Sequence, residues 1–349
     1  MKAMVLSEYS KLQMEEVPRP VVGADELLIE VAACGICGSD VHGYDGSTGR
    51  RIPPIVMGHE AAGTVAGVGA EVTNFAVGDR VTFDSTVFCG VCEYCRKGEV
   101  NLCNRREVIG VSCPEFRRSG AFAEYLTVPA RVAYRLPEGL SFTDAAMLEA
   151  VSVALHGVAV TEMRGGESVL VIGAGMIGLL LVQAARVAGA ARVWVSDVDA
   201  TRLRLAKEMG AEETFLVTGE ALKDEVLRRT DGRGVDAVFE AVGREETIAA
   251  GIDCVRKGGT VTLVGNISPA ISLPLQKVVS RQIRLQGSCA SAGEYPEAMR
   301  LIASGAIKVA PLISAVAPLC EGPRWFERLH AREPNLMKVV LDPRAEEAR

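Results

Sequence analysis

The sequence lacks a hydrophobic run long enough to cross a membrane. Its longest apolar stretch, residues 173–190, contains Gln183 and Arg186, whereas a transmembrane helix needs about 20 predominantly apolar residues. The first residues of the chain carry neither the apolar core nor the cleavage site of a secretory leader. We therefore expect a cytoplasmic protein with no membrane partner, in which the ten cysteines are metal ligands or core thiols rather than disulfides.

The sequence also lacks an excess of positive charge, internal repeats and low-complexity segments. Its net charge of -6 argues against nucleic acid as a partner, because binding to phosphates depends on clustered lysines and arginines. A length of 349 residues predicts two domains. The composition is that of an ordinary globular protein.

The N-terminal part, residues 1–155, has the pattern of a β-rich domain. Short runs with strand-like composition are separated by glycine and proline, and no long helical period interrupts them before about residue 142. This pattern predicts a twisted barrel or sandwich. The segment 290–349 contains a predicted helix and a final strand, which we expect to return to this domain. The predicted strands are residues 27–33, 62–70, 78–83 and 121–128.

From about residue 156 to 289 the pattern changes to strands that alternate with helices. Six buried strands alternating in this way predict a doubly wound parallel sheet, so the fold class is α/β. The predicted strands are residues 168–172, 192–196, 214–217, 235–243, 258–265 and 283–287.

A glycine-rich turn follows the first of these strands. Gly173, Gly175 and Gly178 have the G-x-G-x-x-G spacing, which permits a tight turn, close approach of the backbone to a pyrophosphate, and close packing of helix on strand. Asp197, at the end of the next strand, can bind both hydroxyls of an adenosine ribose and would repel a 2′-phosphate. The pattern favours NAD over NADP, with Arg202 near enough to lie along the adenine. The alternatives are FAD, which uses the same fingerprint, and glycine turns without a ligand.

Four cysteines are clustered in residues 89–103. Their C-x2-C-x2-C-x7-C spacing fits tetrahedral zinc, and four thiolates leave no open coordination position, so the site is predicted to be structural. An iron–sulfur cluster is possible by ligand type. A redox role is disfavoured, because it requires a lone C-x-x-C at the start of a helix. The four residues are Cys89, Cys92, Cys95 and Cys103.

A second set of potential metal ligands is dispersed through three motifs. A single cysteine or histidine in such a run is more often a packing residue, but two of the chain's four histidines lie in the first two motifs. Cysteine, histidine and carboxylate together make a site with an exchangeable position, as catalytic zinc requires. The residues are Cys34, Cys37, Ser39, Asp40 and His42 in the first motif, His59 and Glu60 in the second, and Glu149 and His156 in the third.

These motifs, in this order and at these intervals, resemble those of the zinc-dependent medium-chain alcohol and polyol dehydrogenases. The motifs are "CGICGSDVH", "GHEAAGTV", the four-cysteine lobe and "GAGMIG", and the resemblance covers essentially the whole chain. It implies a GroES-like β-barrel catalytic domain joined to a Rossmann domain. The sequence is most similar to the branch of sorbitol and galactitol-1-phosphate dehydrogenases, in which Glu149 stands where alcohol dehydrogenases have a third, cysteine ligand.

The resemblance also implies roles for individual residues. Cys37 and His59 would bind a catalytic zinc, with Glu60 or Glu149 supplying the carboxylate. Asp40 would orient His59, whereas Cys34 and His156 would be packing residues. The proton of the substrate would pass to Ser39 and then to His42. The expected cofactors are NAD and two zinc ions per subunit, and the expected NAD-binding residues are Gly173, Gly175, Met176, Ile177, Gly178, Asp197, Arg202, Val242, Val264 and Gly265.

The expected reaction is reversible hydride transfer between NAD and a secondary alcohol of a polyol or sugar alcohol. Arg50 and Arg51 would bind a substrate phosphate or form an exposed basic loop. L-Threonine and vicinal diols are alternative substrates. Other classes are a zinc-free quinone reductase and a non-catalytic nucleotide-binding protein, and a homodimer or homotetramer is expected by analogy.

Overall fold

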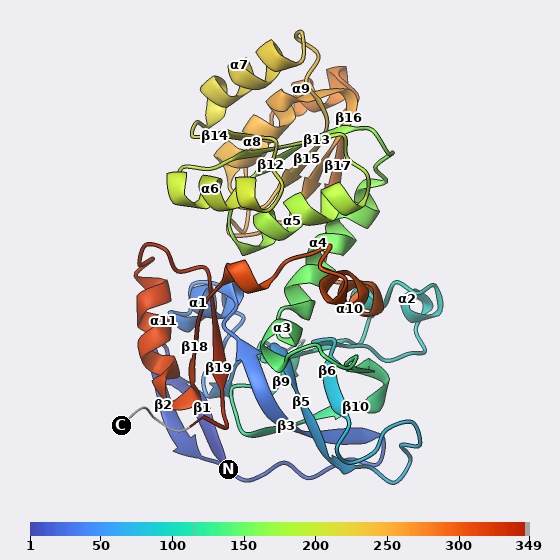
Figure 1. The fold of residues 1–349 in the computed structure, drawn as a ribbon, viewed down its shortest axis with the longest axis vertical. Helices are drawn as coiled ribbons and strands as arrows, with labels where there is room; N and C mark the ends of the chain where they lie inside the picture. The colour runs from blue at the N-terminus through green and yellow to red at the C-terminus, as the bar shows by residue number, and fades with distance from the viewer. Residues whose placement is uncertain (115, 346–349) are drawn as a thin grey trace. The chain divides into compact units, whose positions relative to one another are not determined.

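The computed structural model describes residues 1–114 and 116–345, which form two compact units. The first unit comprises residues 1–149, 291–304 and 309–349, and the second comprises residues 150–290 and 305–308. Figure 1 shows the chain from its N-terminus in blue to its C-terminus in red. The predicted C-terminal segment, 290–349, includes residues 346–349, which lie outside the described residues.

The first unit is built on a seven-stranded sheet. In its central strand, Leu27, Ile29 and Val31 point to one face and are fully buried in the main hydrophobic core of the unit, as the two-residue period of a strand requires. The sheet order is β11 (Ala133–Arg135), β6 (Arg80–Phe83), β5 (Glu60–Val68), β3 (Glu26–Gly35), β19 (Lys338–Asp342) and β18 (Ile313–Pro318), and β10 (Tyr125–Pro129) also pairs with β3.

Two small sheets and several helices complete this unit. The first small sheet has the order β2 (Lys11–Glu16), β1 (Lys2–Glu8) and β4 (Ile55–Val56), and the second has the order β7 (Thr86–Val87), β8 (Glu107–Ile109) and β9 (Arg117–Arg118). The helices are α1 (Gly38–Tyr44), α2 (Glu93–Arg96), α3 (Phe142–Ala145), α10 (Tyr295–Ala303) and α11 (Gly322–His330).

The prediction that the final strand returns to the first domain is confirmed. Strand β19 pairs antiparallel with β3, with Val340 opposite Gly35 and Leu341 opposite Cys34. One strand was predicted too long, because residues 121–124 precede β10 rather than belong to it. The short helix α1 was not predicted.

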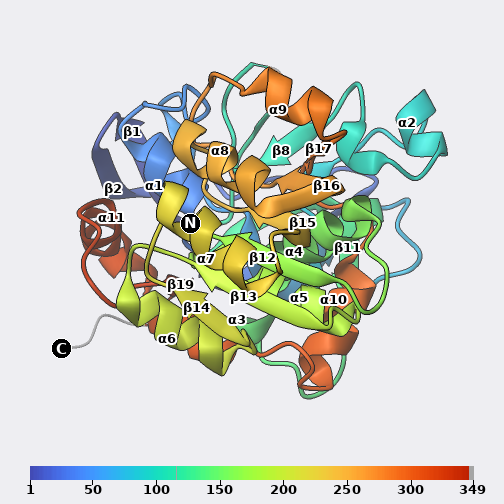
Figure 2. The same ribbon diagram turned by 90° about the horizontal axis from the view of Figure 1, so that it is seen from above.

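The second unit contains a six-stranded, all-parallel sheet, as predicted. Helices α5 and α6 cover one face, and α7, α8 and α9 cover the other (Figures 1 and 2). The strand order is β14 (Glu213–Phe215), β13 (Arg192–Ser196), β12 (Ser168–Ile172), β15 (Val235–Glu240), β16 (Val255–Leu263) and β17 (Arg284–Gly287). The helices are α5 (Met176–Val187), α6 (Ala200–Glu208), α7 (Gly219–Arg229), α8 (Glu245–Cys254) and α9 (Leu275–Ser280).

Helix α4 (Leu148–Thr161) begins at the end of the first unit's long N-terminal segment and continues in the second unit. Together with α3 it forms the stretch 142–161, which is long and apolar enough to cross a membrane by length and composition, so the expectation that no run reaches this length is wrong. Most of this stretch is buried inside the protein, so it is weak support for a membrane span.

Candidate active site

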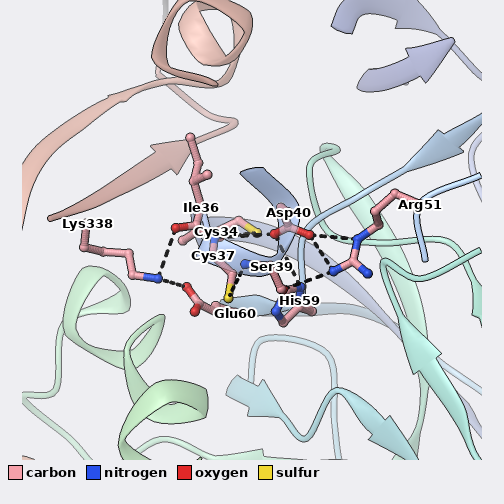
Figure 3. Close-up of polar contacts among 10 residues, drawn as sticks. Cys34, Ile36, Cys37, Ser39, Asp40, Arg51, His59, Glu60 and Lys338 are labelled. Carbon is pink, nitrogen blue, oxygen red and sulfur yellow. Dashed lines mark hydrogen bonds and ion pairs between the residues drawn. The ribbon is translucent and has the colours of Figure 1, made fainter. Parts of the chain in front are cut away.

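The pairing of β3 with β5 brings three potential metal ligands together. Cys37 follows the end of β3 and caps the N-terminus of α1, while His59 immediately precedes β5 and Glu60 is its first residue. Gly35 is directly opposite Glu60 in this antiparallel ladder, so residues that are about 20 positions apart in the sequence become neighbours. The Cys37 sulfur, a His59 ring nitrogen and a Glu60 carboxylate oxygen all lie within 4.8 Å of one another. Figure 3 shows the three side chains.

The surroundings of His59 favour a cation beside its ring. Asp40 Oδ2 lies 3.4 Å from Nδ1 of the buried His59, which directs the other ring nitrogen, Nε2, away from Asp40. Burial lowers the pKa of His59, but Asp40 and Cys37 outweigh it and raise that pKa well above its ordinary value. A thiol, an imidazole and a carboxylate whose donor atoms lie this close together match the donor set of an open zinc site, so these residues fit the metal.

Asp40 is fully buried and its two carboxylate oxygens have different partners. Oδ2 faces His59, whereas Oδ1 accepts hydrogen bonds from Arg51 Nε at 3.1 Å and from Arg51 Nη2 at 2.8 Å. Burial raises the pKa of Asp40, but His59 and Arg51 outweigh it and hold that pKa well below its usual range. The orienting contact that the resemblance implied between Asp40 and His59 is therefore present.

Glu60 is paired with a residue that the sequence analysis missed. The buried Lys338, at the start of β19, forms an ion pair with Glu60 Oε2 and donates a hydrogen bond to the Ile36 carbonyl at 3.1 Å (Figure 3). Burial lowers the pKa of Lys338, but the charges of Glu60 and Cys37 more than offset this and raise it. A lysine at the head of the apolar run "KVVL" was the available signal, because an unpaired lysine is almost never fully buried.

Glu149 lies in the first turn of α4 and is not one of the three clustered ligands. The pKa of Glu149 is raised to about 7, and burial is the main cause. Glu60 also raises this pKa and His59 lowers it, so the charges of both residues act on the Glu149 carboxyl group. The sequence left the choice between Glu60 and Glu149 open. Of the two glutamates, Glu60 is the one whose carboxylate lies within 4.8 Å of the Cys37 and His59 donor atoms.

The two predicted relay residues, Ser39 and His42, are exposed on α1. Ser39 Oγ accepts a hydrogen bond from Arg51 Nη2 at 3.2 Å. The expectation of an exposed loop is therefore wrong for Arg51: its side chain is 3 % exposed and donates hydrogen bonds to Asp40 and Ser39. Arg50 is exposed.

The four clustered cysteines also converge. Their sulfurs all lie within 4.8 Å of one another, with Cys92 and Cys95 at 3.5 Å and Cys89 and Cys95 at 4.0 Å. Zinc–sulfur bonds of about 2.3 Å in a tetrahedron place the sulfurs about 3.8 Å apart, so the cluster has the dimensions of a four-thiolate zinc site. Backbone N–H groups of Val91 and Cys92 lower the pKa of Cys89 to about 6, whereas burial and the adjacent sulfurs raise that of Cys95 to about 12. Four negatively charged thiolates at these distances repel one another, so a cation is required to hold them together.

The glycine-rich turn between β12 and α5 has the geometry of a dinucleotide loop. Gly173 has φ +97°, a conformation that favours glycine. A Cβ on Gly178 would lie 1.8 Å from the Gly173 carbonyl oxygen, whereas a Cβ on Gly175 would meet nothing within 4 Å. Gly175 caps α5, and Met176 and Ile177 form its first turn, so free backbone N–H groups at the helix start are available to a phosphate.

Asp197, at the end of β13, braces this turn. Its Oδ2 accepts a hydrogen bond from the Ala174 N–H at 2.6 Å, and its Oδ1 accepts one from the Asp199 N–H at 2.9 Å. Arg202 lies in α6, with its Nε 3.8 Å from Asp199 Oδ2. Asp197 thus lies directly beside the glycine turn, as a ribose-binding carboxylate should.

Comparison with known proteins identifies the family. The chain matches the alcohol dehydrogenase GroES-like domain over residues 23–138 and the zinc-binding dehydrogenase domain over residues 177–304. It is 34% identical over 347 residues to the sorbitol dehydrogenase of Bacillus subtilis (strain 168), covering 98% of this chain and 97% of that protein. The chain belongs to the zinc-binding dehydrogenase family. It is an alcohol dehydrogenase that depends on zinc and on a nicotinamide dinucleotide, as predicted.

Two solved structures are similar to this dehydrogenase along its whole length. Galactitol-1-phosphate dehydrogenase from Escherichia coli has a TM-score of 0.90 and 28% identity, covering 98% of this chain and 100% of that one. A structure described as a zinc-binding dehydrogenase from Sinorhizobium meliloti 1021, bound to NADP, has a TM-score of 0.87 and 34% identity, covering 98% of this chain and 99% of that one. The predicted fold, a GroES-like domain with a Rossmann-type parallel sheet, is confirmed.

The remaining predicted cofactor residues of the dehydrogenase lie in the loops after β15 and β16. Val242 follows β15, and Val264 and Gly265 follow β16. The two loops are held together by Glu240, a fully buried residue that the sequence analysis missed. Its side chain accepts hydrogen bonds from the backbone of Val242 at 3.0 Å, and its carbonyl accepts them from Val264 at 2.9 Å and Gly265 at 3.0 Å.

None of the ten cysteines, all of which lie in the described ranges, forms a disulfide. Cys34 is buried, as its predicted packing role requires, and His156 is buried as well. Cys113 and Cys254 are buried core thiols, but Cys320 is exposed and Cys289 is partly exposed. The prediction of a core position is therefore wrong for Cys320.

Proposed function

We propose that this dehydrogenase oxidises a secondary alcohol of a polyol or sugar alcohol to the corresponding ketose with NAD as acceptor. The observation that carries the proposal is the convergence of Cys37, His59 and Glu60 on one point, with Asp40 behind His59. The sorbitol and galactitol-1-phosphate dehydrogenases similar to this chain support a polyhydroxylated substrate.

The proposed reaction removes a hydride and a proton from the CH–OH group, giving a ketone, NADH and H⁺. When bound, zinc lowers the pKa of the substrate hydroxyl as a Lewis acid, and NAD accepts the hydride. We assign zinc binding to Cys37, His59 and Glu60. Glu149, in the first turn of α4, would serve as the alternative carboxylate that exchanges with Glu60, as the family resemblance implies. A carboxylate in place of a second thiolate suits substrates that chelate through two oxygens.

Side chains of the protein transfer the substrate proton to solvent. We assign Ser39 Oγ as the first acceptor of the substrate proton and His42, three residues along the same short helix, as the residue that releases it to solvent. Asp40 holds the His59 ring in place throughout. We assign a second, structural zinc to the four-cysteine cluster, which has no open position for a substrate.

We further propose that Asp197 selects NAD by accepting hydrogen bonds from both ribose hydroxyls, with Arg202 along the adenine. Asp197→Ala is expected to reduce the ratio of kcat/KM for NAD to that for NADP by at least about tenfold, because removal of the carboxylate also removes its repulsion of a 2′-phosphate. Steady-state kinetics with both cofactors measure the ratio. Asp199→Ala, which changes a carboxylate two residues away, is the control and should leave it nearly unchanged.

The proposed function is tested by metal removal together with a substrate panel. We expect activity on sorbitol or galactitol 1-phosphate to disappear after dialysis against a strong chelator and to return when zinc is added. Activity that persists in zinc-free protein would contradict the mechanism. Preferential activity on threonine or 2,3-butanediol would replace the polyol assignment, and bound NAD without turnover of any alcohol would favour a nucleotide-binding protein.

We also propose a cytoplasmic homodimer or homotetramer, by analogy with the family. Light scattering of the purified protein measures the assembly, and a monomer at micromolar concentration would contradict this proposal.

A further inference from the structure

We propose that Arg51 is a positioning residue for proton transfer and that it couples the relay serine to the carboxylate that holds His59. This inference rests on the proposed role of Ser39. It begins from a contact that neither family resemblance nor motif spacing indicated: one buried guanidinium touches both Asp40 and Ser39 (Figure 3).

The geometry of Arg51 is that of a fixed fork. Nε and Nη2 both donate to Asp40 Oδ1, at 3.1 and 2.8 Å, and Nη2 also donates to Ser39 Oγ at 3.2 Å. A planar guanidinium holds two partners in a defined relation that the flexible, point-like ammonium of lysine does not reproduce. Arg51 is 3 % exposed and Asp40 is fully buried, so water cannot readily replace these hydrogen bonds.

The chain leaves space specifically for this side chain. A Cβ on Gly43, in α1, would lie 2.3 Å from Arg51 Cγ and 3.1 Å from Arg51 Cβ. The helix that carries Ser39 and His42 therefore has a glycine on the side where the arginine stem crosses it. Alanine at position 43 would therefore displace the Arg51 side chain without changing any charge.

Two consequences follow for the chemistry. Arg51 holds Asp40 Oδ1 with two hydrogen bonds, which fixes the carboxylate with its other oxygen, Oδ2, on His59. Arg51 also donates into Ser39 Oγ, which fixes the oxygen and stabilises negative charge on it while the serine passes its own proton toward His42 and receives the substrate's. The proton count is unchanged, because the serine ends the transfer protonated and one proton reaches solvent.

The test compares Arg51→Met with Arg50→Met, the same substitution at the exposed neighbouring arginine. Assayed with excess zinc, Arg51→Met is expected to lower kcat about 100-fold, the lower range for a lost acid–base contribution, with KM changed less than about threefold. Its solvent deuterium isotope effect on kcat should rise as proton transfer becomes rate-limiting. The affinity of the catalytic site for zinc should fall about tenfold, as is typical when the partner of a ligand is disturbed. With sorbitol as the substrate, which has no phosphate for Arg50 to bind, Arg50→Met should match the unsubstituted protein.

A kcat within twofold of normal and an unchanged isotope effect in Arg51→Met would overturn the proposal. Where Arg51→Met does not fold, Gly43→Ala provides the same test with every charge retained, and normal kcat in that variant would likewise overturn the proposal.

Ser39→Ala separates this inference from the proposed function. Full activity in Ser39→Ala refutes the relay itself, whereas loss of activity there combined with a normal Arg51→Met variant refutes only the role of Arg51.

Discussion

Substitution of Cys37 by alanine is expected to reduce kcat/KM by about three orders of magnitude. The Cys37 sulfur lies within 4.8 Å of the donor atoms of both His59 and Glu60, and its loss leaves two ligands where catalytic zinc sites use three. Lewis-acid stabilisation by the metal is worth several kcal/mol, and each 1.36 kcal/mol is tenfold in rate. The variant should contain about one zinc per chain by elemental analysis, because the four-cysteine cluster is unaffected.

Cys34→Ala is the matched control for this experiment. Cys34 is a fully buried cysteine three residues away, and it is not a member of the group formed by Cys37, His59 and Glu60. Its replacement should lower stability by about 1 kcal/mol while zinc content and kcat/KM stay near normal. Equal losses of activity in both variants would show that Cys37 acts through packing, which would contradict its assignment as a ligand.

Lys338→Met is expected to destabilise the protein by about 3–5 kcal/mol. Lys338 and Glu60 are each buried, and removal of one partner of a buried ion pair leaves an uncompensated charge. The methionine also cannot replace the hydrogen bond to the Ile36 carbonyl. Chemical denaturation of the metal-free protein measures the change, because zinc bound to Glu60 would itself compensate that charge; the transitions of the two units are fitted jointly.

Two further variants establish that burial causes this loss. Lys277, in the second unit, has a side chain that is 52% exposed and pairs with Asp253 at 2.7 Å. Lys277→Met should therefore lower the free energy of unfolding by no more than about 1 kcal/mol. Adding Glu60→Gln to Lys338→Met should recover part of the lost stability, because the buried charge is then removed. If Lys338→Met and Lys277→Met cost the same, the ion pair with Glu60 is not a structural contact in solution.

The second unit shows how much of a fold local sequence can specify. Strands β12 and β13 were predicted with their observed bounds, because each is a short apolar run that ends at a glycine or acidic turn. Parallel strands separated by helices leave few alternative topologies. The first unit was harder, since its strands are short and pair across long sequence distances. The predicted strand at 121–128 merged an irregular segment with β10, because both are similarly apolar.

The candidate active site was predictable where one short motif holds the residues together. Cys37, Ser39 and Asp40 lie in one turn, and the two-residue motif of His59 and Glu60 is placed beside them by the ladder between β3 and β5. Arg51 and Lys338 could not be placed from spacing, because each reaches its carboxylate partner only after tertiary packing. A basic residue looks the same in sequence whether it is solvated or paired in the core.

The ion pair between Glu60 and Lys338 also sets an order for the biosynthesis of the catalytic site. The two residues are separated by 278 positions, which a ribosome that adds about 5–20 residues per second covers in about 14–56 seconds. Cys37, His59 and Glu60 leave the ribosome long before strand β19 is made, so during that interval the nascent site carries the negative charge of Glu60 without its counter-charge. Strand β19 therefore both pairs with β3 in the sheet of the first unit and supplies the positive charge of Lys338 that balances Glu60.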